Sequence, residues 1–334
     1  MNKETIDKIN ILISSPKKIA IITHVNPDGD ALGSSLALMG VLAKDGHSVS
    51  VITPNEYPQF LAWMPGSKEI IIYKHDQVNA DEVIMKADIV FCLDFNDISR
   101  MDMIVEIYKK SNAVKILIDH HLKPSVFTDF TISESDTSST SELIYEFIVA
   151  LNKKHLLNKE ISECLYVGIV TDTGSFSYSC NSYKTYLIIS ELFKLEIDGE
   201  NIHRLIYDTF SENRMRLLGY CLSEKLKVLN EYHTAYIYLT NDDLKRFKYD
   251  TGDSEGIVNY ALSIEGIYRA ALFIERGGHI KVSLRSKGDV QVNDIASKYY
   301  DGGGHLNAAG GYSYISMEET LSKFEEIISN NDII

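Results

Sequence analysis

Apolar runs alternate with helix-period segments along the first third of the chain. The amino-terminal residues 1–18 have the pattern of a short amphipathic helix, and a second helical pattern over Gly33–Ala43 begins at Ser34 and Ser35. Four apolar runs have the pattern of strands in a sheet covered on both faces: 19–22, 49–52, 89–93 and 116–118. The alternation continues through residue 121 and predicts an α/β domain whose mostly parallel sheet carries helices on both faces.

The pattern changes in the second half of the chain. Ser139-Thr140-Ser141-Glu142 is a capping-box start for a helix, and residues 160–170 and about 183–229 also have helical periodicity. Strand patterns follow over residues 234–239, 268–275 and 280–286, the last two joined by Arg276-Gly277-Gly278, a hairpin signature. We therefore expect three parts: a catalytic domain over residues 1–190, a helical linker over 191–225, and a smaller carboxyl-terminal α/β domain with a mixed sheet over 226–334.

Composition places the chain among globular proteins. It has 334 residues, of which 45% are hydrophobic and 24% charged, and its net charge is −14. The acidic balance argues against binding along long duplex nucleic acid but leaves room for a pocket enzyme acting on a short nucleotide. With no signal-peptide pattern, no apolar run long enough for a bilayer and four scattered cysteines, we expect a cytoplasmic protein without a membrane partner.

Acidic and imidazole side chains follow the predicted strands. Because parallel strands of an open sheet bind ligands at their carboxyl ends, these groups should meet at one edge. The candidate metal ligands are His24, Asp28, Asp30, Asp94, His120 and Asp172. Four carboxylates balance two divalent cations, and the mixed oxygen and nitrogen donors favour Mn²⁺, with Mg²⁺ or Co²⁺ as alternatives. One carboxylate must then bridge the ions, and Asp94, alone at its strand end, is the natural choice.

Two such ions predict phosphoester hydrolysis by a metal-bridging hydroxide. Any one of these acids taken alone would be read as a helix cap or turn residue, and any one histidine as a core residue. Three clusters at three strand ends favour the metal centre.

Four motifs resemble those of the DHH phosphoesterase family. They are His24-x-x-Pro27-Asp28-Gly29-Asp30, Asp94 with Arg100 six residues on, Asp119-His120-His121, and Thr171-Asp172-Thr173-Gly174. Residues 302–311, GGGHLNAAGG, resemble the glycine-rich motif of the DHH-associated substrate domain, and the nearest subgroup is the nanoRNase and 3′-phosphoadenosine 5′-phosphate (pAp) phosphatase type. The resemblance implies that one ion takes His24, Asp28 and Asp94, and the other takes Asp30, Asp94, His120 and Asp172.

Further residues are candidates for proton transfer and substrate binding. Asp119 is expected to orient a neighbouring metal-binding histidine, and His121 to contact the scissile phosphate or act as an acid; the alternatives are a turn cap and a structural histidine. Arg100 and Ser34 are candidate phosphate contacts; the alternatives are that Arg100 is an exposed helix residue and that Ser34 is a helix N-cap. In the carboxyl-terminal domain the candidates are Arg285, the less favoured Arg269, Gly303, Gly304, His305 and Asn307.

The sequence thus predicts a two-metal phosphodiesterase or phosphatase whose carboxyl-terminal domain closes over a short RNA, the dinucleotide pApA, or pAp. An exopolyphosphatase or inorganic pyrophosphatase on the same catalytic domain is the alternative within the enzyme class, although the glycine-rich motif disfavours the pyrophosphatase. A nucleotide-binding regulator without turnover is the alternative outside it. The sequence leaves open which of these substrates is preferred and in which direction an RNA is cleaved. It also leaves open the oligomeric state, including whether the chain forms a homodimer.

Overall fold

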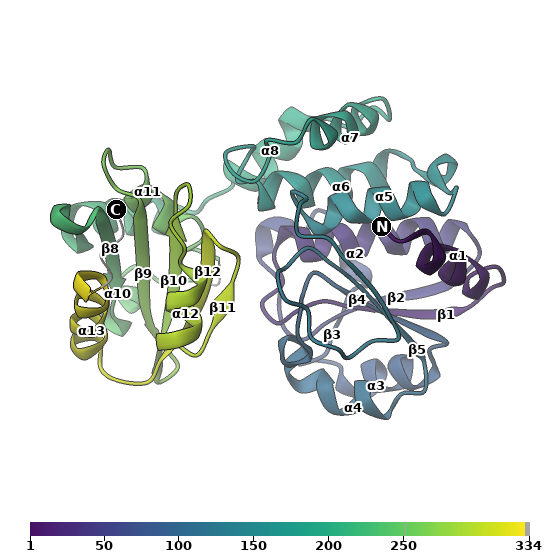
Figure 1. Cartoon of the computed structure of the whole chain (residues 1–334), viewed down its shortest axis with the longest axis horizontal. Coiled ribbons are helices and arrows are strands. Elements are labelled where there is room, and N and C mark those ends of the chain that lie inside the picture. Colours follow the sequence, from purple (N-terminus) through teal and green to yellow (C-terminus); the bar gives the residue numbers. More distant parts are fainter. Residues whose placement is uncertain (251, 331–334) are drawn as a thin grey trace. The chain divides into compact units, whose positions relative to one another are not determined.

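The computed structural model describes residues 1–250 and 252–330 and divides the chain into two compact units. The first spans Met1–Thr209 and the second Phe210–Ile334. The division falls inside the segment expected as a linker, and each unit has its own sheet (Figure 1). Residues 331–334 of the expected carboxyl-terminal domain lie outside the described residues.

The first unit is built on a six-stranded parallel sheet with the order β3-β2-β1-β4-β5-β6. Its strands are β1 (Lys18–Ile22), β2 (Ser48–Thr53), β3 (Ile71–Ile72), β4 (Ile89–Leu93), β5 (Val114–Asp119) and β6 (Phe130–Ser133). Its helices are α1 (Lys3–Leu12), α2 (Gly29–Lys44), α3 (Gln77–Lys86), α4 (Val105–Lys110), α5 (Thr140–Ala150), α6 (Lys159–Asp172), α7 (Tyr183–Phe193) and α8 (Gly199–Tyr207). The expected α/β architecture is confirmed, with the short strands β3 and β6 as additions at the two edges.

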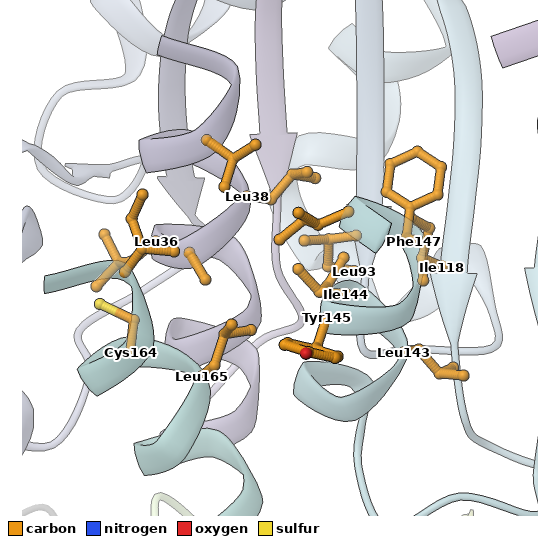
Figure 2. Packing of buried hydrophobic residues seen from close by; sticks show 14 of the residues in the cluster. Leu36, Leu38, Leu93, Ile118, Leu143, Ile144, Tyr145, Phe147, Cys164 and Leu165 are labelled. Carbon is orange, nitrogen blue, oxygen red and sulfur yellow. The ribbon is translucent and has the colours of Figure 1, made fainter. Parts of the chain in front are cut away.

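Both faces of this sheet are covered, because successive residues of each strand pack on opposite sides. In β1, Ile19 and Ile21 pack into the cluster that holds α2, α5 and α6, while Ala20 and Ile22 pack into the cluster that holds α3 and α4. Figure 1 shows these two helical layers on either side of the strands, and Figure 2 shows α2, α5 and α6 meeting over β4 and β5.

A glycine sets the spacing between two helices of this layer. A Cβ at Gly33 of α2 would lie 2.5 Å from the carbonyl oxygen of Cys164 in α6, so no larger residue fits without moving a backbone. This close approach holds the carboxyl end of α6, where Asp172 lies, against the start of α2.

The second unit has a mixed six-stranded sheet with the order β11-β12-β10-β9-β8-β7. Its strands are β7 (Leu226–Leu229), β8 (Thr234–Leu239), β9 (Arg269–Arg276), β10 (His279–Ser286), β11 (Gly303–Gly304) and β12 (Ala308–Ser313). Its helices are α9 (Glu212–Tyr220), α10 (Asn241–Arg246), α11 (Ile257–Leu262), α12 (Asn293–Tyr299) and α13 (Met317–Asn330). Among the described strands of this second sheet, only the β8–β9 pair is parallel, so the mixed sheet is confirmed. The hairpin is confirmed as well, with positive φ at both Gly277 and Gly278.

Three local predictions are wrong. The first helix ends at Leu12 rather than near residue 18, and the apolar Ile11 within it is 72% exposed. The second helix begins at Gly29 rather than Ser34, because Asp28 supplies the N-cap.

The third error concerns the segment expected to be continuously helical to residue 229. It contains α7, α8, α9, a single π-helical turn over Cys221–Lys225 and then strand β7. The apolar residues of β7 lie in a strand because β8 offers an edge with which they pair, a contact that periodicity alone does not reveal.

Two other expectations concern cysteines and membranes. All four cysteines are free and buried, as expected for structural thiols. Within the described part of the chain, none of the helices combines the length and the apolar character needed to cross a bilayer.

Candidate metal centre

The topology of the first sheet gathers polar residues at its carboxyl edge. Strands β1, β4 and β5 are parallel neighbours, so the segments following them emerge side by side. The chain order reverses between β1 and β4, and ligands of open α/β sheets bind at such a point. His24 follows β1, Asp94 follows β4 and His120 follows β5, which brings all three together.

Asp94 lies between the two histidines. Its Oδ2 is 3.5 Å from His24 Nε2, and its Oδ1 is 3.5 Å from His120 Nε2. The residue is 2% exposed, and its φ of 68° lies in the left-handed region that non-glycine residues rarely adopt. The strained turn after β4 therefore presents each carboxylate oxygen to a different imidazole, which is the arrangement that a bridging ligand needs.

His24, Asp28 and Asp94 form one group of potential ligands, with donor atoms within 4.8 Å of one another. His24 Nδ1 lies 2.9 Å from the carbonyl oxygen of Val25, so a neutral ring carries its proton there and turns the Nε2 lone pair toward the carboxylates. Asp28 Oδ1 lies 4.0 Å from Nε2 and also accepts the N–H groups of Asp30 and Ala31 at the start of α2.

Asp30, His120 and Asp172 form a second group. His120 Nε2 lies 3.9 Å from Asp30 Oδ2 and 3.5 Å from Asp172 Oδ2. These separations are too long for hydrogen bonds. They match the spacing of neighbouring ligands that each lie about 2.1 Å from a shared ion.

The amino terminus of α5 supports two of these carboxylates. The backbone N–H groups of Thr140 and Ser141 donate to Asp30, at 2.6 and 2.8 Å, and the Thr140 hydroxyl donates to Asp94 Oδ1 at 2.9 Å. Gly168 of α6 leaves room for this contact, because a Cβ there would lie 1.9 Å from Ser141 Oγ and 2.7 Å from Asp30 Oδ1.

Sequence reasoning missed this role of Thr140. The signal was the Ser139–Glu142 capping box, which marks where a helix starts but not what its N–H groups face. The Ser139 side chain does accept the Glu142 N–H. The Glu142 carboxylate bonds instead to Ser138 and to Thr185 at 2.8 Å, so it does not close the box.

Burial makes this cluster unfavourable without cations. Burial, joined by the charges of Asp30 and Asp28, holds the pKa of Asp94 well above its usual range. Burial likewise raises the pKa of Asp30, and it lowers the pKa of His24 to about 4, which keeps that imidazole neutral. Neutral imidazoles and clustered carboxylates are the donor set that divalent cations prefer, so the residues fit two such ions.

Asp119 contacts His121 rather than the adjacent His120. Its Oδ1 lies 2.7 Å from His121 Nδ1, and its buried Oδ2 has no hydrogen-bond partner among the described residues. Strand β5 ends at Asp119, so the two histidines follow the strand rather than continue it. Their rings lie 4.9 Å apart, edge to face, and His121 Nδ1 is 3.9 Å from Asp94 Oδ1.

The two candidate phosphate contacts of the first unit have different surroundings. The Arg100 side chain is exposed, and its carbonyl accepts the Val25 N–H at 2.7 Å, which ties its segment to the loop after β1. Ser34 is fully buried, and its hydroxyl donates to the carbonyl of Asp30 at 2.7 Å within α2. The hydroxyl of Ser34 is therefore engaged inside α2 and is not exposed for the expected phosphate contact, and the alternative N-cap role belongs to Asp28.

The candidates of the second unit gather where β10 and β12 pair, since Arg285 lies opposite Ala308. Asn307 Nδ2 donates to Ser286 Oγ and to the carbonyls of Gly288 and Val290, at 2.9, 2.9 and 3.1 Å, so it fixes the loop after β10.

The glycine-rich segment beside them forms strand β11. Gly303 and Gly304 pair with β12, and the His305 N–H bonds the Ala308 carbonyl at 2.8 Å to close a tight turn. A Cβ at Gly304 would lie 2.5 Å from that same carbonyl oxygen, so this backbone approach requires a glycine. Arg269 is 4% exposed, and its Nε has no hydrogen-bond partner among the described residues.

Comparison with known proteins agrees with this fold. The family model for the N-terminal domain of the DHH family matches residues 18–169, and the DHHA1 domain matches residues 230–330. A relative from Streptococcus mutans is 31% identical over 92% of this chain and 93% of its own length. The chain belongs to the DHH family and is a phosphoesterase with an N-terminal DHH domain and a DHHA1 domain.

Two relatives and one solved structure are described as particular kinds of phosphoesterase or as related to one. The Streptococcus mutans protein is described as a probable bifunctional oligoribonuclease and PAP phosphatase, NrnA. The NrnA of Bacillus subtilis, a bifunctional oligoribonuclease and PAP phosphatase, is 29% identical over 96% of this chain and 97% of its own length. A crystal structure from Bacteroides fragilis, described as an exopolyphosphatase-related protein, shares 45% identity over 98% of this chain and 96% of its own, with a TM-score of 0.94.

Proposed function

We propose that this protein is a two-metal phosphoesterase that hydrolyses short oligoribonucleotides and pAp. The observation that carries the proposal is the placement of Asp94, whose two oxygens face two different histidines at the same 3.5 Å. The near full-length similarity to two NrnA proteins supports the choice of substrates.

The ligand sets follow from the two groups of side chains. His24, Asp28 and Asp94 would hold one cation, and Asp30, Asp94, His120 and Asp172 the other. Mn²⁺ is the proposed ion, since carboxylate and imidazole donors suit it and a RecJ exonuclease with the same fold, at 14% identity and a TM-score of 0.51, is described as bound to manganese. Bound at these positions, two divalent cations supply Lewis acidity and an activated water for attack on phosphorus.

The chain's own residues then bind and orient the substrate. Asp119 holds His121 Nδ1 at 2.7 Å, which sets the ring for proton donation to the leaving oxygen of the phosphoester. Arg285 is the proposed phosphate contact of the DHHA1 domain. The glycine-rich turn at residues 303–305 would hold the substrate's terminal nucleotide, and Asn307 keeps the adjoining loop in place.

The decisive experiment compares substrates side by side with Mn²⁺. Purified protein is assayed with pAp, pApA, a five-nucleotide RNA, polyphosphate and pyrophosphate, and released mononucleotide and phosphate are quantified. We expect the protein to turn over pAp and the short RNAs, and we expect EDTA to abolish this activity. Turnover confined to polyphosphate or pyrophosphate would contradict the proposal.

An exopolyphosphatase is the second candidate, because the Bacteroides fragilis protein with the TM-score of 0.94 is described as exopolyphosphatase-related. The same assay separates the two. Rapid phosphate release from long polyphosphate, with pAp untouched, would favour the second candidate.

A further inference from the structure

The loop that follows Asp172 is held in one strained conformation. The Thr173 carbonyl accepts the N–H groups of Ser177 and Tyr178, at 2.8 and 2.9 Å, and its hydroxyl accepts the Phe176 N–H at 3.1 Å. Thr173 is itself buried, and its hydroxyl donates to the carbonyl of Ile169 at 2.7 Å in the last turns of α6. The loop is thus hydrogen-bonded to the helix that ends at the candidate metal ligand.

Three consecutive residues of this loop have positive φ. Gly174, Ser175 and Phe176 have φ values of 54°, 57° and 62°. Only glycine adopts this region readily, so the loop keeps Ser175 and Phe176 there against their preference. The consequence is a fixed direction for the aromatic side chains that the loop carries.

The Tyr178 ring packs directly on Gly174. A Cβ at Gly174 would lie 2.7 Å from Cδ2 and 2.8 Å from Cε2 of Tyr178, so the ring occupies the space that a side chain would fill. Gly174 lies two positions after Asp172, and their Cα atoms are therefore at most about 7 Å apart. Yet Tyr178 is 43% exposed. A half-exposed aromatic ring thus lies beside the backbone that directly follows the candidate metal ligand Asp172.

A second half-exposed tyrosine adjoins the loop. The Tyr186 ring of α7, 50% exposed, has its centroid 6.0 Å from that of Phe176. Phe176 in turn packs on the largely buried Tyr166 of α6, with centroids 6.4 Å apart. The Tyr186 ring is therefore supported by the partly buried Phe176, and Phe176 by the buried Tyr166, which limits the freedom that Tyr186 can lose when a ligand stacks on it.

Helix α8 also contacts the loop. His203 Nε2 of α8 is 3.2 Å from Ser175 Oγ, and the exposed Arg204 follows it in the chain. Aromatic faces for bases combined with cations for phosphates are the features by which proteins bind single-stranded nucleic acid.

We propose that Tyr178 and Tyr186 form a stacking platform for one nucleobase of a single-stranded oligoribonucleotide whose scissile phosphate lies at the metal centre. The proposal rests on the proposed function. It assigns to the DHH domain a base contact that extends the substrate site beyond the metals. The platform is sequence-tolerant, since every base has a face on which a tyrosine ring can stack.

The test couples a change in the protein to a change in the RNA. Five-nucleotide RNAs carry an abasic ribose at one position each, and kcat/KM is measured with wild-type protein, Tyr178→Ala, Tyr178→Phe and Tyr186→Ala. Tyr183→Ala is the matched control, because Tyr183 lies on the same helix and is 79% exposed but is no part of the platform.

We expect one abasic position to lower kcat/KM of the wild-type protein roughly 5- to 100-fold, the effect of losing one base–aromatic stack. That penalty should vanish in Tyr178→Ala and shrink in Tyr186→Ala, and it should persist in Tyr178→Phe and Tyr183→Ala. Metal content should be the same in all five proteins.

Other results overturn the platform. Equal penalties in wild type and Tyr178→Ala at every position would refute it while leaving the proposed function standing. A dimer in sedimentation that Tyr178→Ala and Tyr186→Ala dissociate, without coupling to any base, would show that a second copy of the chain covers the rings. A wild-type protein that hydrolyses no RNA would refute the proposed function and the platform with it.

Discussion

Replacing Thr140 with valine tests whether the amino terminus of α5 tunes the metal centre. The Thr140 hydroxyl donates to Asp94 Oδ1 at 2.9 Å, and both residues are at most 2% exposed. Valine has nearly the same shape and retains the backbone N–H that donates to Asp30. The substitution therefore removes one hydrogen bond to one carboxylate and little else.

The size of the effect follows from the charge and burial of the acceptor. A hydrogen bond to a charged group contributes about 1.5–3 kcal/mol. Divided by the 1.4 kcal/mol that corresponds to a tenfold change, this amounts to roughly 10- to 100-fold in affinity, the range found when residues that orient metal ligands are changed. We expect Mn²⁺ binding to at least one site to weaken by this factor, with kcat falling in parallel at limiting Mn²⁺.

The measurement is a calorimetric titration of EDTA-treated protein with Mn²⁺, supported by thermal melts that check folding. Thr140→Ser keeps the hydroxyl and should bind within about threefold of wild type, whereas Asp94→Ala should lose metal and turnover together. Wild-type Mn²⁺ affinities and kcat in Thr140→Val would refute the reasoning, because the hydroxyl would then contribute nothing to the carboxylate it contacts.

Three further outcomes follow from the structure. Arg285→Ala should raise KM for short RNA about tenfold or more while leaving Mn²⁺ binding unchanged, and an unchanged KM would remove it from the substrate site. Gly302→Ala should lower the free energy of unfolding by about 1–3 kcal/mol, since its Cβ would lie 1.9 Å from the Gly310 carbonyl oxygen. Gly303→Ala, whose Cβ would contact nothing within 4 Å, should melt like wild type, and equal melting temperatures of the two variants would contradict this reasoning. In metal-free protein, the lowered pKa of His24 means that this side chain takes up a proton near pH 6.5 in the unfolded state and only near pH 4 in the folded state, so the free energy of unfolding should fall as the pH falls through that window. Urea unfolding at pH 6.5 and at pH 5 should therefore show a larger loss of stability for wild type than for His24→Gln.

Periodicity and strand-end chemistry were enough to predict the architecture of the first unit. Apolar runs such as Ile19–Ile22 have few alternatives to a doubly covered strand, and parallel strands align their carboxyl ends. The six candidate ligands could therefore be named without coordinates. Element boundaries were less predictable, because the start of α2 depends on whether Asp28 or a later serine caps it, and both residue types cap helices.

What only the tertiary structure decided is which groups meet across long stretches of sequence. Thr140 contacts Asp94 although 46 positions separate them, and Asp119 contacts His121, two positions on, rather than the adjacent His120. The close approach of α6 to α2 at Gly33 likewise depends on how two helices pack, not on either helix alone. Sequence determines which side chains and which periods are present, since those are local properties. Packing determines which hydroxyl or N–H group faces the candidate metal ligands, since that depends on contacts between segments far apart in the chain.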